Sequence, residues 1–351
     1  MDAEVPDASV IVRSMARPTL DTALASLAAQ VGATIEVLVV AAIGHSHPSV
    51  PAACGPHALR LVAGDAPLQR SAAANAGLDA ARGRWITFLD DDDRFEPDHV
   101  GALLAAAAAA PTASVITSYA KAVHRDGGTD LVGQPFSLAQ LHERNFIHLS
   151  SALVVRSLVV QGARFDESLD VLEDWDFMLQ LAQRATFHFV PLASFQWNAD
   201  AGTSGAGRGA NHDAAKFATH RDRIYAKWGP AHDALVARTQ PLLERALDAA
   251  RQRRFDEAQA RCDEVLAISA NDPWALNLKA MILNRQGRVA EARDLQTLAV
   301  SVRPQDASFV YNLAQLDRAA GDLDAARDHA RKAGELAPDF APAKALIEQL
   351  R

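Results

Sequence analysis

The last third of the chain repeats with a fixed period, and this feature constrains the fold more than any other. The segments 255–258, 289–292 and 323–326 each begin with an apolar residue and end with alanine, and they start 34 residues apart. Prolines 304 and 338 keep the same spacing, as do glycines 287 and 321. Self-similarity at this scale is typical of stacked units that bury their apolar faces against one another. Because the segment is rich in alanine, we expect the units to be helical.

The first part of the chain alternates strand and helix signals instead. Short apolar runs are followed by longer segments with helical spacing, and this alternation predicts a mostly parallel α/β sheet. In such sheets ligands bind beyond the carboxyl ends of the strands. We expect strands at residues 9–12, 35–40, 59–62, 85–89 and 113–118, and helices at 19–31, 68–81 and 97–110.

Two later segments are less regular. Residues 129–197 show no sustained strand or helix period, and residues 199–212 contain glycines at 202, 205, 207 and 209 with few apolar residues. That glycine-rich composition predicts a mobile loop. A plain linker and a lid over a binding site are equal alternatives for it.

Four consecutive aspartates, Asp90 to Asp93, follow the expected strand at 85–89. Carboxylates crowded at a strand end repel one another, and fold stability gives little reason to place them there. Binding of a hard divalent cation would explain the cluster, since Mg²⁺ and Mn²⁺ take oxygen ligands and often lie between protein carboxylates and substrate phosphates. The alternative is a solvated acidic turn before the helix that follows Pro97.

Composition excludes several classes of protein. The net charge of −8 argues against a general nucleic-acid binder. The two cysteines, Cys54 and Cys262, lie far apart, which argues against a disulfide framework and fits a reducing compartment. The first residues are acidic and do not resemble a secretory signal, and no apolar stretch is long enough to span a bilayer. We therefore expect a cytoplasmic protein without a transmembrane segment, with peripheral attachment to the inner face of the membrane left open.

Four blocks of the first part, in order, resemble family 2 glycosyltransferases with a GT-A fold. They are residues 9–12, 20–30, 75–97 with the aspartate tetrad, and 165–177, so the resemblance covers about residues 8–230. It implies a Rossmann-like mixed sheet with flanking helices over residues 1–235. The repeats resemble tetratricopeptide repeats, which implies an all-α domain over residues 236–351 with about three repeats and a capping helix.

The family resemblance assigns roles to the tetrad. The metal motif Asp-x-Asp maps onto Asp90 and Asp92, so Asp92 is expected to bind Mn²⁺ or Mg²⁺ at the donor diphosphate, with Asp90 as a second ligand near the donor ribose. Asp91 is the middle position and is expected to be the most dispensable, while Asp93 orients the loop. His212 is a candidate further metal ligand, although a loop histidine is more often simply solvated.

The resemblance also points to Glu173 and Asp174, which match the family's Glu-Asp pair. Asp174 is expected to be the general base of an inverting transfer, since a carboxylate within reach can take the proton of an attacking acceptor. The alternative is an acidic helix start stabilised by the helix dipole. Arg13, Arg17 and Arg70 are expected to bind the donor phosphates, with ion pairing as their alternative.

The leading hypothesis is therefore a metal-dependent glycosyltransferase that moves a sugar from a nucleotide-diphosphate donor to a protein or to a cell-surface glycan precursor. The repeats are expected to bind a protein or peptide, or to form a homo-oligomer. Two departures from the family, Ala41 at the end of the second strand and the altered segment 13–16, motivate an alternative, an inactive domain that serves as a scaffold. A nucleotidyltransferase is disfavoured because residues 13–19 lack a glycine-rich loop.

Overall fold

The computed structural model describes residues 5–200 and 213–350, and the chain divides into two compact units. Unit 1 comprises Met1–Gln134 and Arg144–Trp228, and unit 2 comprises Pro135–Glu143 and Gly229–Arg351. The sequence suggested a boundary near residue 235. The units divide after Trp228, and a short segment from within the first part of the chain is grouped with the second unit.

Unit 1 is built on one mixed sheet, which has ten strands in the described residues. The strand order is β3-β4-β2-β1-β5-β9-β7-β10-β6, with β8 paired to β7. The strands are β1 (Ala8–Ser14), β2 (Ile35–Ala41), β3 (Ala53–Cys54), β4 (His57–Val62), β5 (Trp85–Asp90), β6 (Arg94–Phe95), β7 (Val115–Val123), β8 (Thr129–Val132), β9 (Ala152–Val155) and β10 (Phe187–Asn198).

The main strands of this sheet follow the parallel arrangement that the alternating pattern predicts, and one antiparallel strand, β9, interrupts them. β4, β2, β1 and β5 are parallel neighbours. β9, however, runs antiparallel to both β5 and β7. Because β9 is antiparallel to both of these neighbours, β7 runs in the same direction as β5, and β10 pairs parallel to β7. The expected strands therefore share one direction, and the mixed sheet implied by the family resemblance is confirmed, with β9 as the reversed strand between β5 and β7.

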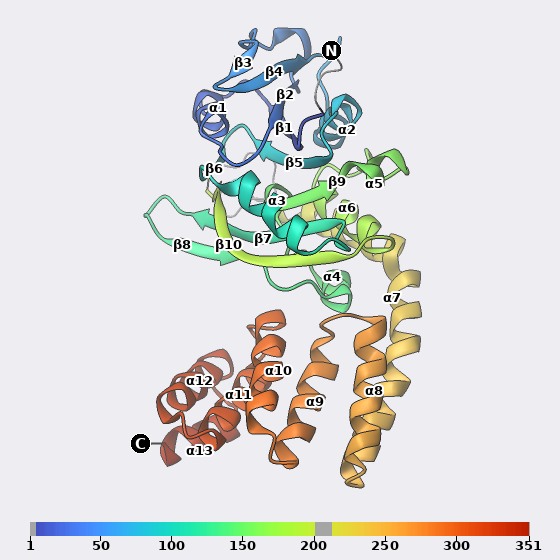
Figure 1. Cartoon of the computed structure of the whole chain (residues 1–351), viewed down its shortest axis with the longest axis vertical. Helices are drawn as coiled ribbons and strands as arrows, with labels where there is room; N and C mark the ends of the chain where they lie inside the picture. The colour runs from blue at the N-terminus through green and yellow to red at the C-terminus, as the bar shows by residue number, and fades with distance from the viewer. Residues whose placement is uncertain (1–4, 201–212, 351) are drawn as a thin grey trace. The chain divides into compact units, whose positions relative to one another are not determined.

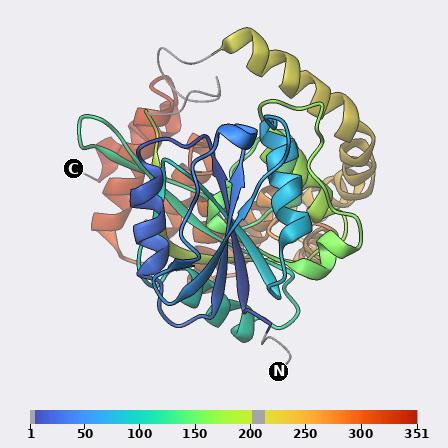
Figure 2. The ribbon, with the colours of Figure 1, turned by 90° about the horizontal axis from the view of Figure 1, so that it is seen from above.

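Helices cover both faces of the parallel strands. Figure 2 shows α1 (Leu20–Ala28, blue) and α2 (Arg70–Ala80, cyan) on opposite sides of them. The reason is topological: α1 connects β1 to β2, whereas α2 leads back from β4 to β5 in the opposite direction along the sheet. Right-handed crossovers in opposite directions place their helices on opposite faces. The other helices of unit 1 are α3 (His99–Ala109), α5 (Arg156–Val160), α6 (Glu173–Ala182), the first part of α7 (Ala214–Arg251), and the 3₁₀ turns η1 (Gly44–Ser46) and η2 (Leu149–Ser151).

Continuous apolar runs form the central strands because these strands are covered on both sides. Every residue of β1 and β2 is buried. The helix α2 lies very close to β1 at Gly77, where an added Cβ would fall 2.3 Å from Cγ2 of Ile11. The absence of a side chain at Gly77 therefore sets the distance between the helix and the strand.

The longest strand, β10, was not expected from the sequence. Figure 1 shows it as the long yellow-green strand that runs along β7. Its residues alternate poorly between buried and exposed, it contains Pro191, and its register with β7 shifts between Val190 and Phe195. A proline inside an apolar run argues against a strand, so sequence patterns alone do not identify this one.

Unit 2 contains paired helices at the predicted 34-residue period. α8 (Phe255–Ile268), α10 (Val289–Val302) and α12 (Leu323–Leu336) start 34 residues apart, and so do α9 (Pro273–Arg285), α11 (Ala307–Ala319) and α13 (Ala341–Gln349). The remainder of α7 precedes them (Figure 1). The alanine that closes each repeated segment, at 258, 292 and 326, is fully buried. Small side chains at these positions allow the helices to pack closely, as the repeat pattern predicts.

The segment Pro135–Glu143, which contains α4 (Leu138–Glu143), is held inside unit 2 by polar contacts. The Nδ2 atom of Asn271 donates to the carbonyl oxygen of Phe136 at 2.9 Å. Arg303 Nη1 lies 3.1 Å from Glu143 Oε2. Among the described residues, no helix in either unit is both long enough and apolar enough to be a membrane span.

Candidate active site

The candidate site lies where the carboxyl ends of β1 and β5 meet. Arg13 near the end of β1 is the register partner of Asp90, the last residue of β5. A turn follows β5, closed by a hydrogen bond from the Asp93 backbone N–H to the Asp90 carbonyl at 3.1 Å. Arg70 is the first residue of α2 and Glu173 is the first residue of α6. The fold thus brings together residues that are far apart in the sequence.

A partly buried ion network joins these four side chains. Arg13 contacts both oxygens of Asp90, through Nε at 2.8 Å and Nη2 at 2.9 Å, and reaches Glu173 Oε1 at 3.0 Å through Nη1. Arg70 contacts Asp90 at 2.8 Å and Glu173 at 3.1 Å. Burial opposes ionisation of Asp90, but the two arginines more than offset it and hold its pKa well below the usual range. The ion pairs left open as the alternative for Arg13 and Arg70 are therefore present in the structure.

Asp91 has a structural position that the sequence did not indicate. Its side chain is fully buried, and one carboxylate oxygen accepts from the Met15 backbone N–H at 2.7 Å and from Ser14 Oγ at 3.2 Å. Its other oxygen accepts from Arg17 Nη1 at 2.6 Å. Asp91 thereby ties the segment after β1 to the end of β5. The expectation that it is the most dispensable aspartate is wrong on this geometry, because its loss would leave several buried donors without an acceptor.

Asp90, Asp92 and Asp93 form a carboxylate cluster. Each offers an oxygen, and these oxygens lie within 4.8 Å of one another. Burial and the charge of Asp90 raise the pKa of Asp92 and raise that of Asp93 well above its usual value. Arg17 is 3.2 Å from Asp92, and Asp93 accepts from the Asn198 backbone N–H at 3.0 Å. The remaining repulsion and the all-oxygen donor set fit a hard divalent cation. His212, the other candidate ligand, lies outside the described residues.

Two cavities meet at this cluster. Cavity A has a volume of about 470 Å³ and includes apolar residues that follow β2 and precede α2. Cavity B has a volume of about 420 Å³ and includes the start of α6 and the segment before η2. Both are lined by Arg13, Arg70, Asp90 and Asp92. A ligand in each cavity would therefore meet the other at the charged residues.

Asp174 lines cavity B but not cavity A. Burial, and then the charge of Glu173, raise its pKa to about 6. The residue before the pair, Leu172, has a left-handed backbone with φ of 62° although it is not glycine. Such strained conformations cluster at functional sites. Here the left-handed residue begins α6 and places both carboxylates at the first turn of the helix.

Three residues that sequence reasoning missed line the same cavity: Asn145, His148 and Trp197. Asn145 donates to Asp174 Oδ2 at 3.1 Å. The ring of His148 lies 5.2 Å from that of Trp197, and burial lowers the pKa of His148 to about 4, so the imidazole is neutral at pH 7. All three come from stretches without a regular pattern, and no motif in the sequence singles them out.

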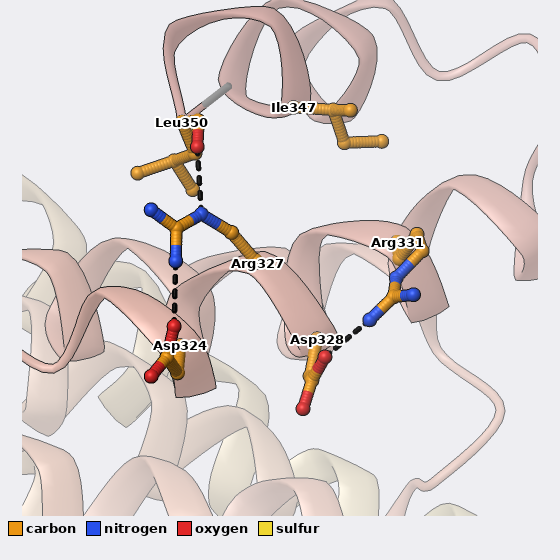
Figure 3. Close-up of a pocket in the computed structure, with 6 residues that line it drawn as sticks. All are labelled: Asp324, Arg327, Asp328, Arg331, Ile347 and Leu350. Atoms are coloured by element: carbon orange, nitrogen blue, oxygen red, sulfur yellow. Dashed lines mark hydrogen bonds and ion pairs between the residues drawn. The ribbon is translucent and has the colours of Figure 1, made fainter.

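Unit 2 contains a separate hollow of about 570 Å³ between α12 and α13. Figure 3 shows that its charged side chains are paired with one another or with backbone. Arg327 contacts Asp324 at 2.6 Å and donates to the Leu350 carbonyl at 2.7 Å, and Arg331 pairs with Asp328. These neutralised i, i+3 pairs are ordinary helix-surface interactions. They offer no set of convergent groups comparable to the aspartate cluster of unit 1.

Comparison with known proteins identifies a family for the part of the chain that contains the aspartate cluster. The model described as glycosyl transferase family 2 matches residues 9–147. The succinoglycan biosynthesis protein ExoO of Rhizobium meliloti is 33% identical over 190 residues, which are 49% of this chain and 54% of ExoO. This chain therefore spans about half the length of that relative.

Two solved structures are similar to this chain over part or most of its length. S. aureus TarS is 15% identical with a TM-score of 0.46, and the match covers 98% of this chain and 55% of TarS. The first tetratricopeptide domain of Spaghetti (RPAP3), solved with an HSP90 peptide, is 18% identical with a TM-score of 0.32, and that match covers 32% of this chain and 90% of the domain. The family match is more specific, and it spans β1, β5, the aspartate tetrad and Asn145. Residues 9–147 are therefore a glycosyl transferase family 2 domain.

Proposed function

We propose that this chain is an inverting, metal-dependent glycosyltransferase that moves a sugar from a nucleotide-diphosphate donor to the hydroxyl of an acceptor. One observation carries the proposal: Asp174, a carboxyl group with a pKa of about 6, lines one of two cavities that share an aspartate cluster. A base with a pKa just below neutral is mostly ionised at pH 7 and can still accept a proton effectively.

Cavity A is the proposed donor site. Arg17 and Arg70 line it, and their side chains are 30% and 32% exposed, so their guanidinium groups can reach phosphate oxygens. Arg13 is only 8% exposed and serves mainly to hold Asp90 and Glu173. The cavity also includes Ala42, where the family commonly has an aspartate nearby, so we propose that the nucleobase meets mainly apolar walls and backbone groups.

The aspartate cluster is the proposed metal site. Asp92 would hold Mn²⁺ or Mg²⁺ together with Asp90, whose two oxygens are already engaged by arginine. When bound, the cation would neutralise charge on the donor diphosphate. Asp93 closes the cluster and connects it to the end of β10 through the Asn198 backbone.

Cavity B is the proposed acceptor site. An acceptor hydroxyl beside Asp174 would attack the anomeric carbon of a sugar whose diphosphate lies in cavity A. The new oxygen–carbon bond forms, the carbon–oxygen bond to the diphosphate breaks, and the hydroxyl proton passes to Asp174. Attack from the side opposite the leaving group inverts the anomeric configuration. Glu173 stays paired with Arg13 and Arg70 and keeps the first turn of α6 in place.

The acceptor and partners are proposed from the relative and from the helical repeats. ExoO is named for the synthesis of a polysaccharide, and we propose a cell-surface glycan precursor as the acceptor of this chain, with a protein acceptor as the alternative. Stacked helix pairs commonly present a concave surface to a peptide or protein. We propose that unit 2 binds such a partner and that the enzyme acts in the cytoplasm.

The proposal is tested with Asp174→Asn in the full chain. A panel of nucleotide sugars with Mn²⁺ or Mg²⁺ first identifies the donor by thermal stabilisation, which a chelator should abolish. Asp174→Asn should then lower the transfer rate by about 10²- to 10⁴-fold, the usual contribution of a general base, with unchanged donor affinity in calorimetry. Asp79→Asn is the matched control, because Asp79 is an exposed carboxylate paired with Arg164 at 2.8 Å on the surface.

Two results would contradict the proposal. Full transfer activity of Asp174→Asn would remove this residue from the role of base. Failure of every nucleotide sugar to bind, with either metal, would favour the inactive scaffold instead.

A further inference from the structure

Asn145 is placed to control the carboxylate of Asp174. Its Nδ2 donates to Asp174 Oδ2 at 3.1 Å, and the other oxygen of Asp174 accepts from the Trp175 backbone N–H at 2.8 Å. The side-chain oxygen of Asn145 accepts from the Ile147 backbone N–H at 3.1 Å. That second bond fixes which end of the amide is the acceptor, so the NH₂ group must face the carboxylate.

The segment around Asn145 is itself well anchored. The next two side chains, Phe146 and Ile147, are each only 3% exposed. The preceding residue, Arg144, donates to Gln134 Oε1 at 2.5 Å. Asn145 therefore lies between fixed neighbours in a stretch without helix or strand, which lets its amide hold one geometry.

The two adjacent carboxylates at the start of α6, Glu173 and Asp174, accept hydrogen bonds from different kinds of donor. Glu173 receives two guanidinium groups, one from Arg13 and one from Arg70. The two donors to Asp174 are neutral, an amide and a backbone N–H. A cationic donor strongly favours the ionised form of a carboxyl group, whereas a neutral donor orients it with a smaller effect on its basicity. The arrangement restrains Asp174 in space while leaving it able to take a proton.

We propose that Asn145 is a positioning residue, which holds Asp174 Oδ2 in the orientation needed for proton abstraction from the acceptor. This inference rests on the proposed role of Asp174 as the base. Asn145 uses one lone pair of Oδ2 and leaves the second for the acceptor hydroxyl. It acts through Asp174 and not on the reacting atoms.

The test compares Asn145→Ala with wild type in the full chain. Loss of the amide should lower kcat by tenfold to a hundredfold, roughly the effect of a misplaced reacting group, while donor affinity measured by calorimetry stays the same. The acid limb of the kcat–pH profile should also move to higher pH, because a hydrogen bond that favours the ionised carboxylate is gone. Asn145→Asp should move the limb further, since it adds a like charge.

Several other charged or titratable side chains surround Asp174. Glu173, Arg13 and Arg70 act on it electrostatically, and Asp90, Asp92, Asp93 and His148 line the same cavity. Asp174 is the carboxylate to which the Asn145 amide donates, so we assign to Asp174 a limb that moves when only this amide is removed.

Asn75→Ala is the matched control. Asn75 makes purely structural bonds to the Phe165 backbone, at 2.9 and 3.0 Å. Its loss should lower the melting temperature without moving the acid limb. If Asn145→Ala keeps the wild-type kcat and limb while Asp174→Asn is inactive, Asn145 has no positioning role and the proposed base is retained. If Asp174→Asn is active, the proposed base fails first.

Discussion

At the scale of single residues, the carboxylates of the aspartate tetrad and of the Glu-Asp pair differ in the groups that they contact. Asp90 and Glu173 are paired with arginine. Asp91 accepts hydrogen bonds from the backbone and from Arg17. Asp174 accepts hydrogen bonds from an amide and a backbone N–H, both neutral. The same residue type therefore serves as an ion-pair hub, a structural link and a candidate base. The difference arises from what each carboxylate touches and not from its place in a motif.

The raised pKa of Asp174 should appear as a pH-dependent cost in stability. Its folded-state pKa of about 6 exceeds the ordinary 3.8, so the folded protein binds the proton more tightly than the unfolded chain. Stability is then lost as pH rises from the lower to the higher value, and the loss is complete above it. Asp174→Asn cannot ionise and should be more stable than wild type near neutral pH, by on the order of 1 kcal/mol or more, with the gain vanishing near about pH 4.

Urea unfolding in the presence of a chelator measures the free energy of unfolding of wild type and of Asp174→Asn at neutral pH and near about pH 4. Asp79→Asn, an exposed position, should show no comparable gain. An Asp174→Asn variant that is destabilised equally at both pH values would show that burial does not raise the pKa of this carboxyl group.

At the scale of elements, the position of α2 depends on the missing side chain at Gly77. Gly77→Ala would place a Cβ 2.3 Å from Cγ2 of Ile11 on a strand that is buried throughout. The helix must shift or the strand must deform, and such overpacking costs about 1–3 kcal/mol. Arg70 is the first residue of α2, so we expect weaker donor binding as well as a lower free energy of unfolding.

Denaturant unfolding and donor calorimetry measure the two effects. Gly334→Ala in α12 is the matched control, because its nearest neighbour, Ile347 Cδ1, is at an ordinary 3.5 Å. That change should be neutral or stabilise by up to about 1 kcal/mol through helix propensity. Equal behaviour of the two variants would mean that the contact between α2 and β1 is not tight at Gly77.

The elements also show how far sequence reasoning reaches. The five expected strands all fall within β1, β2, β4, β5 and β7, or begin just before them, because continuous apolar runs suit strands buried on both faces. β9 and β10 were missed because both lie in the stretch without a sustained period, where β10 also carries a proline and a register shift. The tetrad and the Glu-Asp pair were found from motifs, whereas Asn145 was not, since a single amide in an irregular segment gains its meaning only from Asp174 beside it.

At the scale of the whole molecule, the chain enters unit 2 twice. It does so first at Pro135–Glu143 and again from Gly229 onward. Asn271 and Arg303, from the repeats, bond to the ends of the first segment. Replacing both with alanine should loosen residues 135–143 and speed their amide exchange, because the change removes two polar contacts to the repeats that are each worth about 1 kcal/mol.

Hydrogen exchange with mass spectrometry of the full chain measures this, and peptides covering β5 provide the internal reference. Arg288→Ala is the matched control, since Arg288 pairs with Glu291 in the next turn of its own helix. Unchanged exchange at 135–143 in the double variant would show that other contacts fix the segment within unit 2.

The segment Pro135–Glu143 also bears on how such a protein can be altered by recombination. A repeat array that simply followed a catalytic domain could be exchanged for another by joining two genes at one point. Here a single junction after Trp228 would join a new repeat array to a first part of the chain that still contains residues 135–143. Those nine residues would then lack Asn271 and Arg303, which bind them in this protein. The two units are therefore expected to be inherited and to diverge together, and a working exchange of the repeats would have to replace residues 135–143 at the same time.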